Sequence, residues 1–256
     1  MTAPAHRPAG TEPVLYTGVV VYSTQDPEAS AVLVEGATIT WIGPLENADR
    51  FHPGARRIDA TGCLMAPGFV DSAPLGADAP DATLPEGWRE AAASRGIVAV
   101  NPGTTGEREG IRVVAPVTEA APLKTLARDG VPVAFGSAGA RQAQDPWSWV
   151  RAASREGDPQ ERLSDRAAFL AATRAGHRLA GRMHPGSLTL GGEATFVLWE
   201  PWDLTVHSAD EHTNAWSVDP RSYTPLLPDL SAGAPRALRT VIEGVVVHDD
   251  LPGGAS

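Results

Sequence analysis

The sequence predicts an α/β plus β fold, in which strands at both ends of the chain flank a region of alternating strands and helices. Short β-branched segments separated by turn residues fill residues 14–58, and similar segments return after residue 186. Between these two parts, apolar runs of strand length alternate with segments of helical period. That alternation favours βα units and parallel strand pairing.

The expected elements follow one another along the chain. In the amino-terminal part, three segments have the composition of strands joined by tight turns: 15–22, 31–36 and 38–44. The middle part contains strand candidates at Val70, 97–100, 111–114 and 131–135, and helix candidates at 86–95, 118–129, 147–155 and 164–178. The clearest late strands are 193–199 and 238–247, and a Pro-rich loop at 219–235 separates them.

Composition excludes several classes of partner. The formal net charge is -10, with 31 acidic against 21 basic side chains, so the field of the protein repels nucleic acid. No apolar run approaches the roughly 20 residues of a spanning helix, and residues 1–8 lack the apolar stretch of a signal peptide, so we expect no membrane association and a cytoplasmic location. The single cysteine, Cys63, excludes an internal disulfide. Abundant Ala, Gly, Pro and Arg beside one lysine is typical of bacteria with GC-rich genomes.

Several segments resemble one enzyme family. Residues 41–44, 58–62 and 66–71 are similar to the entry into the barrel of amidohydrolases, and residues 122–147 resemble the last barrel strand and the helix after it. Similarity to the exit from the barrel, the closing strand and a late bacterial segment is found at 186–199, 239–244 and 216–222. The details resemble the YtcJ-like branch, also called the amidohydrolase 3 group, which includes N-substituted formamide deformylases.

This resemblance implies a domain organisation and an activity. Residues 14–66 and 186–250 would combine into one small β-sandwich, residues 67–185 would form the βα domain, and residues 1–13 would be a disordered tail. The family hydrolyses carbon–nitrogen bonds other than peptide bonds, using a hydroxide bound to Zn or another divalent metal.

The βα region is too short for a closed barrel. Eight βα units take about 250 residues, whereas residues 67–185 have room for about four units at roughly 30 residues each. An incomplete (β/α) barrel exposes strand edges, so it must rearrange, dock on the sandwich or pair with a second copy. Homodimerisation is therefore a hypothesis.

The positions of the family's metal ligands carry other residues. The expected His-x-His pair of the first strand falls on residues 72–75, which contain no histidine, and Ala138 stands where the last strand has an aspartate. No histidine lies between His52 and His177, and Lys124 matches no bridging position. No resident cofactor is therefore expected. The resemblance leaves only vestigial site positions, which are Asp71, Ser72, Ala73, Ser137 and Ala138.

The residues at and near the strand ends favour structural roles over chemistry without a metal. Ser137 is a poor nucleophile elbow because Phe135 occupies the position that needs glycine, so a turn that caps a strand is favoured. Asp71 is better interpreted as a cap or turn residue than as a base. The Gly- and Thr-containing segment 101–110 lacks the ending of a P-loop, which predicts a surface turn.

One histidine cluster could bind a metal. His207, Asp210 and His212 could hold Zn or Ni if their loop folded back, and the alternative is a solvated turn between strands. The spacing of the two histidines fits no regular ligand face, which favours the turn.

The sequence therefore predicts an amidohydrolase-like protein that is catalytically degenerate. The alternative is a non-catalytic binding or assembly module, for instance one that regulates an intact amidohydrolase relative, since an open βα sheet can still hold a ligand at its carboxyl edge. A decaying gene product without a retained role is a third hypothesis.

Overall fold

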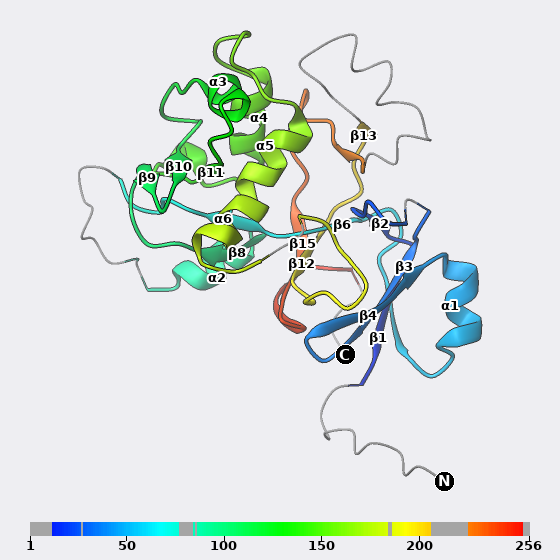
Figure 1. Cartoon of the computed structure of the whole chain (residues 1–256). Helices are drawn as coiled ribbons and strands as arrows, with labels where there is room; N and C mark the ends of the chain where they lie inside the picture. The colour runs from blue at the N-terminus through cyan, green and yellow to red at the C-terminus, as the bar shows by residue number, and fades with distance from the viewer. Residues whose placement is uncertain are drawn as a thin grey trace.

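The computed structural model describes residues 12–26, 28–76, 84, 86–183, 186–205 and 225–252, which form a mixed α/β protein with several sheets. Its central element is a five-stranded sheet with the strand order β16-β15-β12-β6-β2. The bounds are β2 Val20–Val21, β6 Leu64–Ala66, β12 Phe196–Trp199, β15 Ala237–Ile242 and β16 Val245–Asp249. Strands from both ends of the sequence therefore share this sheet (Figure 1).

Two of the three inner strands of this sheet, β6 and β12, are buried on both faces. In β12, Phe196 and Leu198 belong to one apolar cluster, and Val197 and Trp199 belong to another. Because successive side chains of a strand point to opposite faces, each face of the sheet contributes to a different core. A strand buried on both faces has an uninterrupted apolar sequence, as β12 does.

A four-stranded sheet packs on one face of the central sheet. Its order is β4-β3-β1-β5, with β1 Val14–Thr17, β3 Ala31–Glu35, β4 Thr38–Gly43 and β5 Arg56–Asp59. Tyr16 packs edge-on against Phe196 across the two sheets at 5.2 Å between ring centroids. Helix α1, Leu45–Phe51, places the buried Ala48 in a separate small cluster with Leu15 and Leu33 of this sheet.

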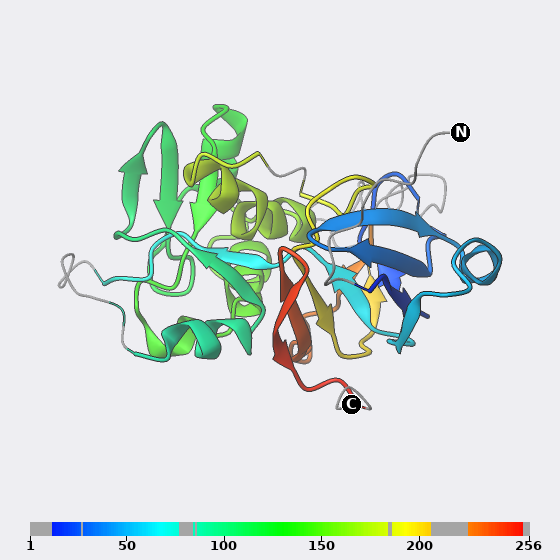
Figure 2. The same ribbon diagram turned by 90° about the horizontal axis from the view of Figure 1, so that it is seen from below.

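The strand and helix units lie beyond the other face (Figure 2). Strands β7 Phe69–Asp71 and β8 Ile97–Val100 pair in parallel, and so do β10 Ile111–Val114 and β11 Val133–Phe135. The helices are α2 Trp88–Ala93, α3 Leu123–Arg128, α4 Trp147–Arg155, α5 Asp165–Ala172 and α6 Arg174–Leu179, with a 3-10 turn η1 at Arg141–Ala143. A short pair, β13 Leu204–Thr205 and β14 Leu227–Pro228, lies near the carboxyl end.

Most expected elements agree with this structure in type, and several differ in extent. The single strand expected at 238–247 is wrong, because a turn at Glu243 and Gly244 divides it into the antiparallel strands β15 and β16. The expected strand at 15–22 is divided into β1 and β2 by Gly18, whose φ of +74° and contact with Thr61 exclude a side chain. The helix expected at 118–129 begins only at Leu123, after Pro122, and the helix expected at 164–178 is interrupted at Thr173. The segment 101–110 is not only a surface turn, because β9 Gly106–Arg108 pairs with β10 in an antiparallel hairpin.

The strands of the βα region form two separate sheets, and no closed barrel is present among the described residues. The expected tail, residues 1–13, lies almost entirely outside the part of the chain that the structure describes. The division into a sandwich and a βα domain stays a prediction. No helix in the described ranges has the length and apolar character needed to cross a bilayer.

A cluster of aromatic rings joins the helices to the central sheet. The fully buried Trp147 stacks on Phe169 at 5.6 Å between centroids and meets Phe69 and Trp199 edge-on at 4.9 and 5.1 Å. These four rings come from α4, α5, β7 and β12. Edge-on aromatic pairs add about 0.5–1.5 kcal/mol each beyond their burial, so this cluster is a main source of cohesion.

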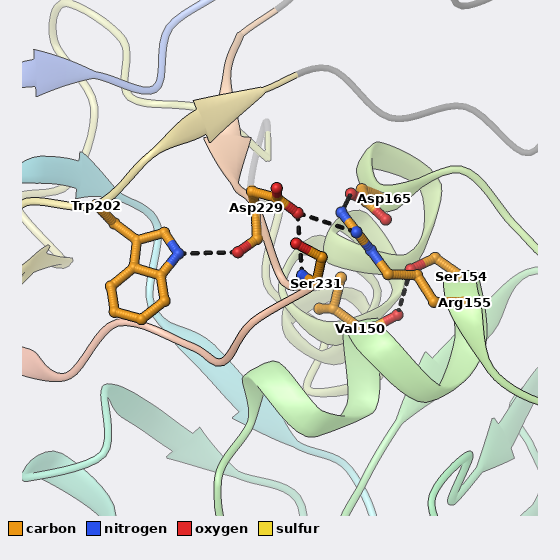
Figure 3. A network of polar contacts seen from close by, with 7 residues as sticks. All are labelled: Val150, Ser154, Arg155, Asp165, Trp202, Asp229 and Ser231. Atoms are coloured by element: carbon orange, nitrogen blue, oxygen red, sulfur yellow. Dashed lines mark hydrogen bonds and ion pairs between the residues drawn. The ribbon is translucent and has the colours of Figure 1, made fainter.

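A polar network also fastens the carboxyl-terminal part to the helices (Figure 3). The guanidinium group of Arg155 donates to Asp165 Oδ2 at 2.9 Å and to Asp229 Oδ1 at 3.0 Å. The backbone N–H of Ser231 also donates to Asp229, and together with Arg155 it lowers the pKa of this carboxyl. Trp202 Nε1 donates to the backbone oxygen of Asp229 at 2.8 Å.

The aromatic cluster predicts the effect of a substitution in α4. Trp147→Ala removes contacts with three rings, and we expect it to reduce the free energy of unfolding by about 3–5 kcal/mol. Phe51→Ala is a suitable control, because Phe51 is 59% exposed and its loss should cost less than about 1 kcal/mol. Urea unfolding followed by circular dichroism measures both. Equal effects of the two substitutions would contradict the role given to the cluster.

Candidate functional site

The ends of β7 and β11 lie side by side, although 64 positions separate Asp71 from Phe135 in the sequence. The backbone N–H of Ser72 donates to Phe135 O at 3.0 Å, and that of Ala138 donates to Ala73 O at 2.7 Å. Gly136 allows this approach, since a Cβ there would lie 2.3 Å from the backbone nitrogen of Ala73. The segments 71–73 and 135–138 therefore form one continuous structure.

The carboxyl group of Asp71 occupies the centre of this structure. Asp71 is 6% exposed, and its Oδ1 accepts hydrogen bonds from the backbone N–H groups of Ala73 and Ser137 at 3.1 and 3.0 Å. Its Oδ2 accepts from Ser137 Oγ at 2.7 Å. Burial raises the pKa of Asp71, because the charged form loses hydration, and these three hydrogen bonds oppose the increase. The carboxyl group thus fastens β7 to β11.

Ser72 lies on the opposite face of β7 and has different neighbours. Asn101 is 6% exposed, and its Nδ2 donates hydrogen bonds to Gly176 O at 2.8 Å and to Ser72 Oγ at 3.4 Å. Arg108 Nη1 donates to the backbone oxygen of Ser72 at 2.8 Å. Gly176 of α6 packs so closely that a Cβ would lie 3.0 Å from Ser72 Oγ. Ser72 is therefore enclosed between β7, β8 and α6.

A pocket of about 490 Å³ opens on the Asp71 face. Asp71 and Ser137 form part of its lining, and Arg95 and Gln144 add a guanidinium and an amide group. Trp88 of α2 contributes an aromatic wall. This volume lies within the range of small-molecule sites, and the lining combines apolar surface with a few polar groups, as such sites do. The pocket is therefore the candidate functional site of the described structure.

The donor set of this pocket does not fit a zinc centre of the amidohydrolase kind. Asp71 and Glu86 are the only His, Cys, Asp or Glu residues in its described lining, and both oxygens of Asp71 already accept hydrogen bonds from the protein. Zinc takes three or four His, Cys or carboxylate ligands. Within the described ranges, no group of three or more His, Cys, Asp or Glu side chains is arranged for a metal ion.

The structure brings together the five site positions singled out from the sequence. Asp71 acts as a turn residue through its bond to Ala73, and Ser137 accepts a hydrogen bond from Gly139 N–H at 3.2 Å, as a turn residue at a strand end does. Ala138 adopts φ +50°, which is unusual for a residue with a side chain. His207, Asp210 and His212 lie outside the described residues.

Some residues of the site were missed at the level of sequence. Arg95, Gln144 and Trp88 reach the pocket only through the tertiary fold, and no local pattern distinguishes them. The prediction of a surface turn at 101–110 is wrong for Asn101, which is buried. A usable signal existed, because Asn101 directly follows a strand, just as Asp71 terminates one. Polar residues at the ends of neighbouring parallel strands meet at one edge.

The raised pKa of Asp71 predicts a pH-dependent effect of a neutral substitution. An acid whose pKa is higher in the folded state favours folding below its unfolded value, about 3.9. This contribution is lost as the pH rises through the folded value, by about 1.4 kcal/mol per pKa unit. Asp71→Asn does not ionise, and its amide can accept from both N–H groups and donate to Ser137 Oγ. Its stability relative to the wild type should therefore increase from pH about 4 upwards.

Urea unfolding at several pH values measures this difference between Asp71→Asn and the wild type. Asp71→Ala is the comparison, because it leaves three donors without their acceptor at a cost of about 1–3 kcal/mol each. A relative stability of Asp71→Asn that falls with rising pH would show that the hydrogen bonds outweigh burial.

Comparison with known proteins supports an amidohydrolase-like fold. A triazine hydrolase variant superposes with a TM-score of 0.61 at 13% identity, covering 93% of this chain and 95% of that one. Atrazine chlorohydrolase TrzN from Arthrobacter aurescens TC1, complexed with zinc and atraton, gives 0.60 at 14% identity and covers 95% and 97%. Enamidase, a member of the amidohydrolase superfamily, gives 0.55 at 13% identity and covers 94% and 97%.

Sequence comparison is more limited. No family profile matches the chain. Imidazolonepropionase from Salinispora arenicola (strain CNS-205) is 52% identical over 44 residues, which are 17% of this chain and 10% of that protein. The matched segment thus spans a tenth of the length of imidazolonepropionase. Structural neighbours of this chain are therefore members of the amidohydrolase superfamily, and at such low identity this likeness establishes the fold alone.

Proposed function

We propose that this chain is a catalytically degenerate amidohydrolase-like protein, whose pocket at the ends of β7 and β11 binds a small ligand without hydrolysing it. The single observation that carries the proposal is the state of Asp71. Its carboxylate sits at the strand end where the family would continue into metal ligands, yet it is committed to Ser137 and Ala73. A carboxylate that accepts three hydrogen bonds within the protein has a structural role and is not free to act as a base or as a metal ligand.

The proposal includes the architecture of the βα region. The parallel pairs β7–β8 and β10–β11, joined where Ser72 N–H donates to Phe135 O, support an incomplete barrel in which the first and last strands still meet. The YtcJ-like branch is the proposed affiliation, on the sequence segments described above.

The lining of the pocket favours an uncharged amide with an apolar substituent. Gln144 offers both a donor and an acceptor, Arg95 offers donors, and Glu86 offers acceptors. Trp88 and Ile97 supply apolar surface for the substituent. Asp71 and Ser137 also line the pocket; both are buried, and their own hydrogen bonds hold them in place.

Catalytic degeneracy is tested by metal content and turnover. Purified protein, assayed with and without added zinc, is expected to contain far less than one zinc per chain and to leave N-formyl and N-acyl amides intact, because the pocket lacks the ligands that hold a metal-bound hydroxide. Elemental analysis and chromatography of the amides measure these results. A zinc-containing amidohydrolase assayed in parallel is the control. Stoichiometric zinc with turnover that is lost in Asp71→Asn would overturn the proposal.

Ligand binding at this pocket is tested by filling it. Ala91 of α2 is exposed and lines the pocket, so Ala91→Trp should occupy the space and weaken binding of an N-acyl amide at least tenfold. Asn47→Trp, on the exposed face of α1, adds the same side chain elsewhere. Isothermal titration calorimetry measures the affinities. Wild-type protein that binds none of the amides, or equal binding by both variants, would refute this site.

A further inference from the structure

A second, largely apolar groove lies between α3 on one side and α5 and α6 on the other. Its volume is about 480 Å³, similar to that of the first pocket, but it shares no residue with that pocket. Leu170 and Ala171 of α5 and Val133 of β11 supply part of its apolar surface. The proposed function does not use this groove.

Cationic side chains gather at one end of the groove. Arg174, Arg178 and Arg182 all line it. Arg174 and Arg178 lie four residues apart in α6, so their side chains share one face of the helix and their charges repel, whereas Arg182 follows the end of this helix. The whole chain carries a net charge of -10, so this basic end contrasts with the rest of the protein.

The three arginines differ in their partners. Arg182 is already neutralised, because its Nη2 lies 3.0 Å from Glu193 Oε2 and 2.9 Å from Glu243 Oε1. Arg174 and Arg178 are exposed, and no hydrogen bond or ion pair joins either of them to another residue in the described part of the chain. Two guanidinium groups beside an apolar groove thus remain available to an anion.

The aliphatic stem of Arg174 lies against a neighbouring loop. A Cβ at Gly186 would lie 2.5 Å from Leu170 Cδ2 and 3.2 Å from Arg174 Cδ, and the φ of +79° at Gly186 favours glycine. Arg174 as a whole is exposed, so its guanidinium group is accessible to an anion.

We propose that this groove binds an amphipathic carboxylate, such as a fatty acid. Arg174 and Arg178 would hold the carboxylate, and the apolar body would extend between α3 and α5. Arginine binds carboxylates through two parallel hydrogen bonds, and an anion here also relieves the repulsion between the two cations. A groove of about 480 Å³ lies within the range of small-molecule sites.

Binding of dodecanoate below its micelle concentration, followed by isothermal titration calorimetry, tests the site. The double variant Arg174→Gln/Arg178→Gln should weaken binding at least tenfold, since glutamine keeps the helix propensity but removes both charges. Ala167→Trp should weaken it similarly, because Ala167 is exposed and lines the groove. Dodecyltrimethylammonium, with the opposite head charge, should not bind.

Matched control variants show whether weaker binding of dodecanoate is due to the loss of this groove's residues. Arg50→Gln/Arg141→Gln removes the same charge from exposed positions outside the groove, and it should leave the affinity for dodecanoate unchanged. Ala91→Trp, which fills the first pocket, should also have no effect. Urea unfolding confirms that each variant is folded. Unaltered binding by the double arginine variant or by Ala167→Trp, or no binding by the wild type, would overturn the proposal.

Discussion

The burial of β12 and β6 on both faces is the constraint on which the rest of this structure depends. Phe196 and Leu198 face the four-stranded sheet, and Val197 and Trp199 face the helices. Neither layer could cover its own apolar face without this shared sheet. Because the sheet takes strands from residues 20–66 and 196–249, both ends of the chain must assemble before either core is complete.

The candidate site derives from the same arrangement. Trp199 of the central sheet packs edge-on against Phe69 of β7, which anchors the strand that ends in Asp71. Asp71 then reaches Ser137, so a chain of contacts connects the core to the meeting point of β7 and β11. The structural role of this carboxylate is consistent with a pocket that lacks metal chemistry. The amidohydrolase-like fold does not by itself imply hydrolytic activity, because fold does not determine function.

The groove beside α5 and α6 shows that the same fold offers more than one place for a ligand. Its chemistry differs from that of the Asp71 pocket, since an apolar surface there ends in two unpaired arginines within the described chain. The two sites lie on different elements, α2 with β7 for one and α3 with α5 for the other, so each can be altered without the other. Homodimerisation of this chain stays a prediction.

By itself, the sequence determined the types of most elements, because apolar period and turn residues act locally: α4 and β8 have the expected bounds. It also determined that Ala138 and residues 72–75 offer no histidine or aspartate, since side-chain identity needs no fold. Only the tertiary structure decided that Asn101 is buried, that Arg95 and Gln144 line one pocket, and that Asp71 binds Ser137. The place of Asn101 directly after a strand was a partial signal. The contacts themselves join segments far apart in the chain, so no local pattern encodes their geometry.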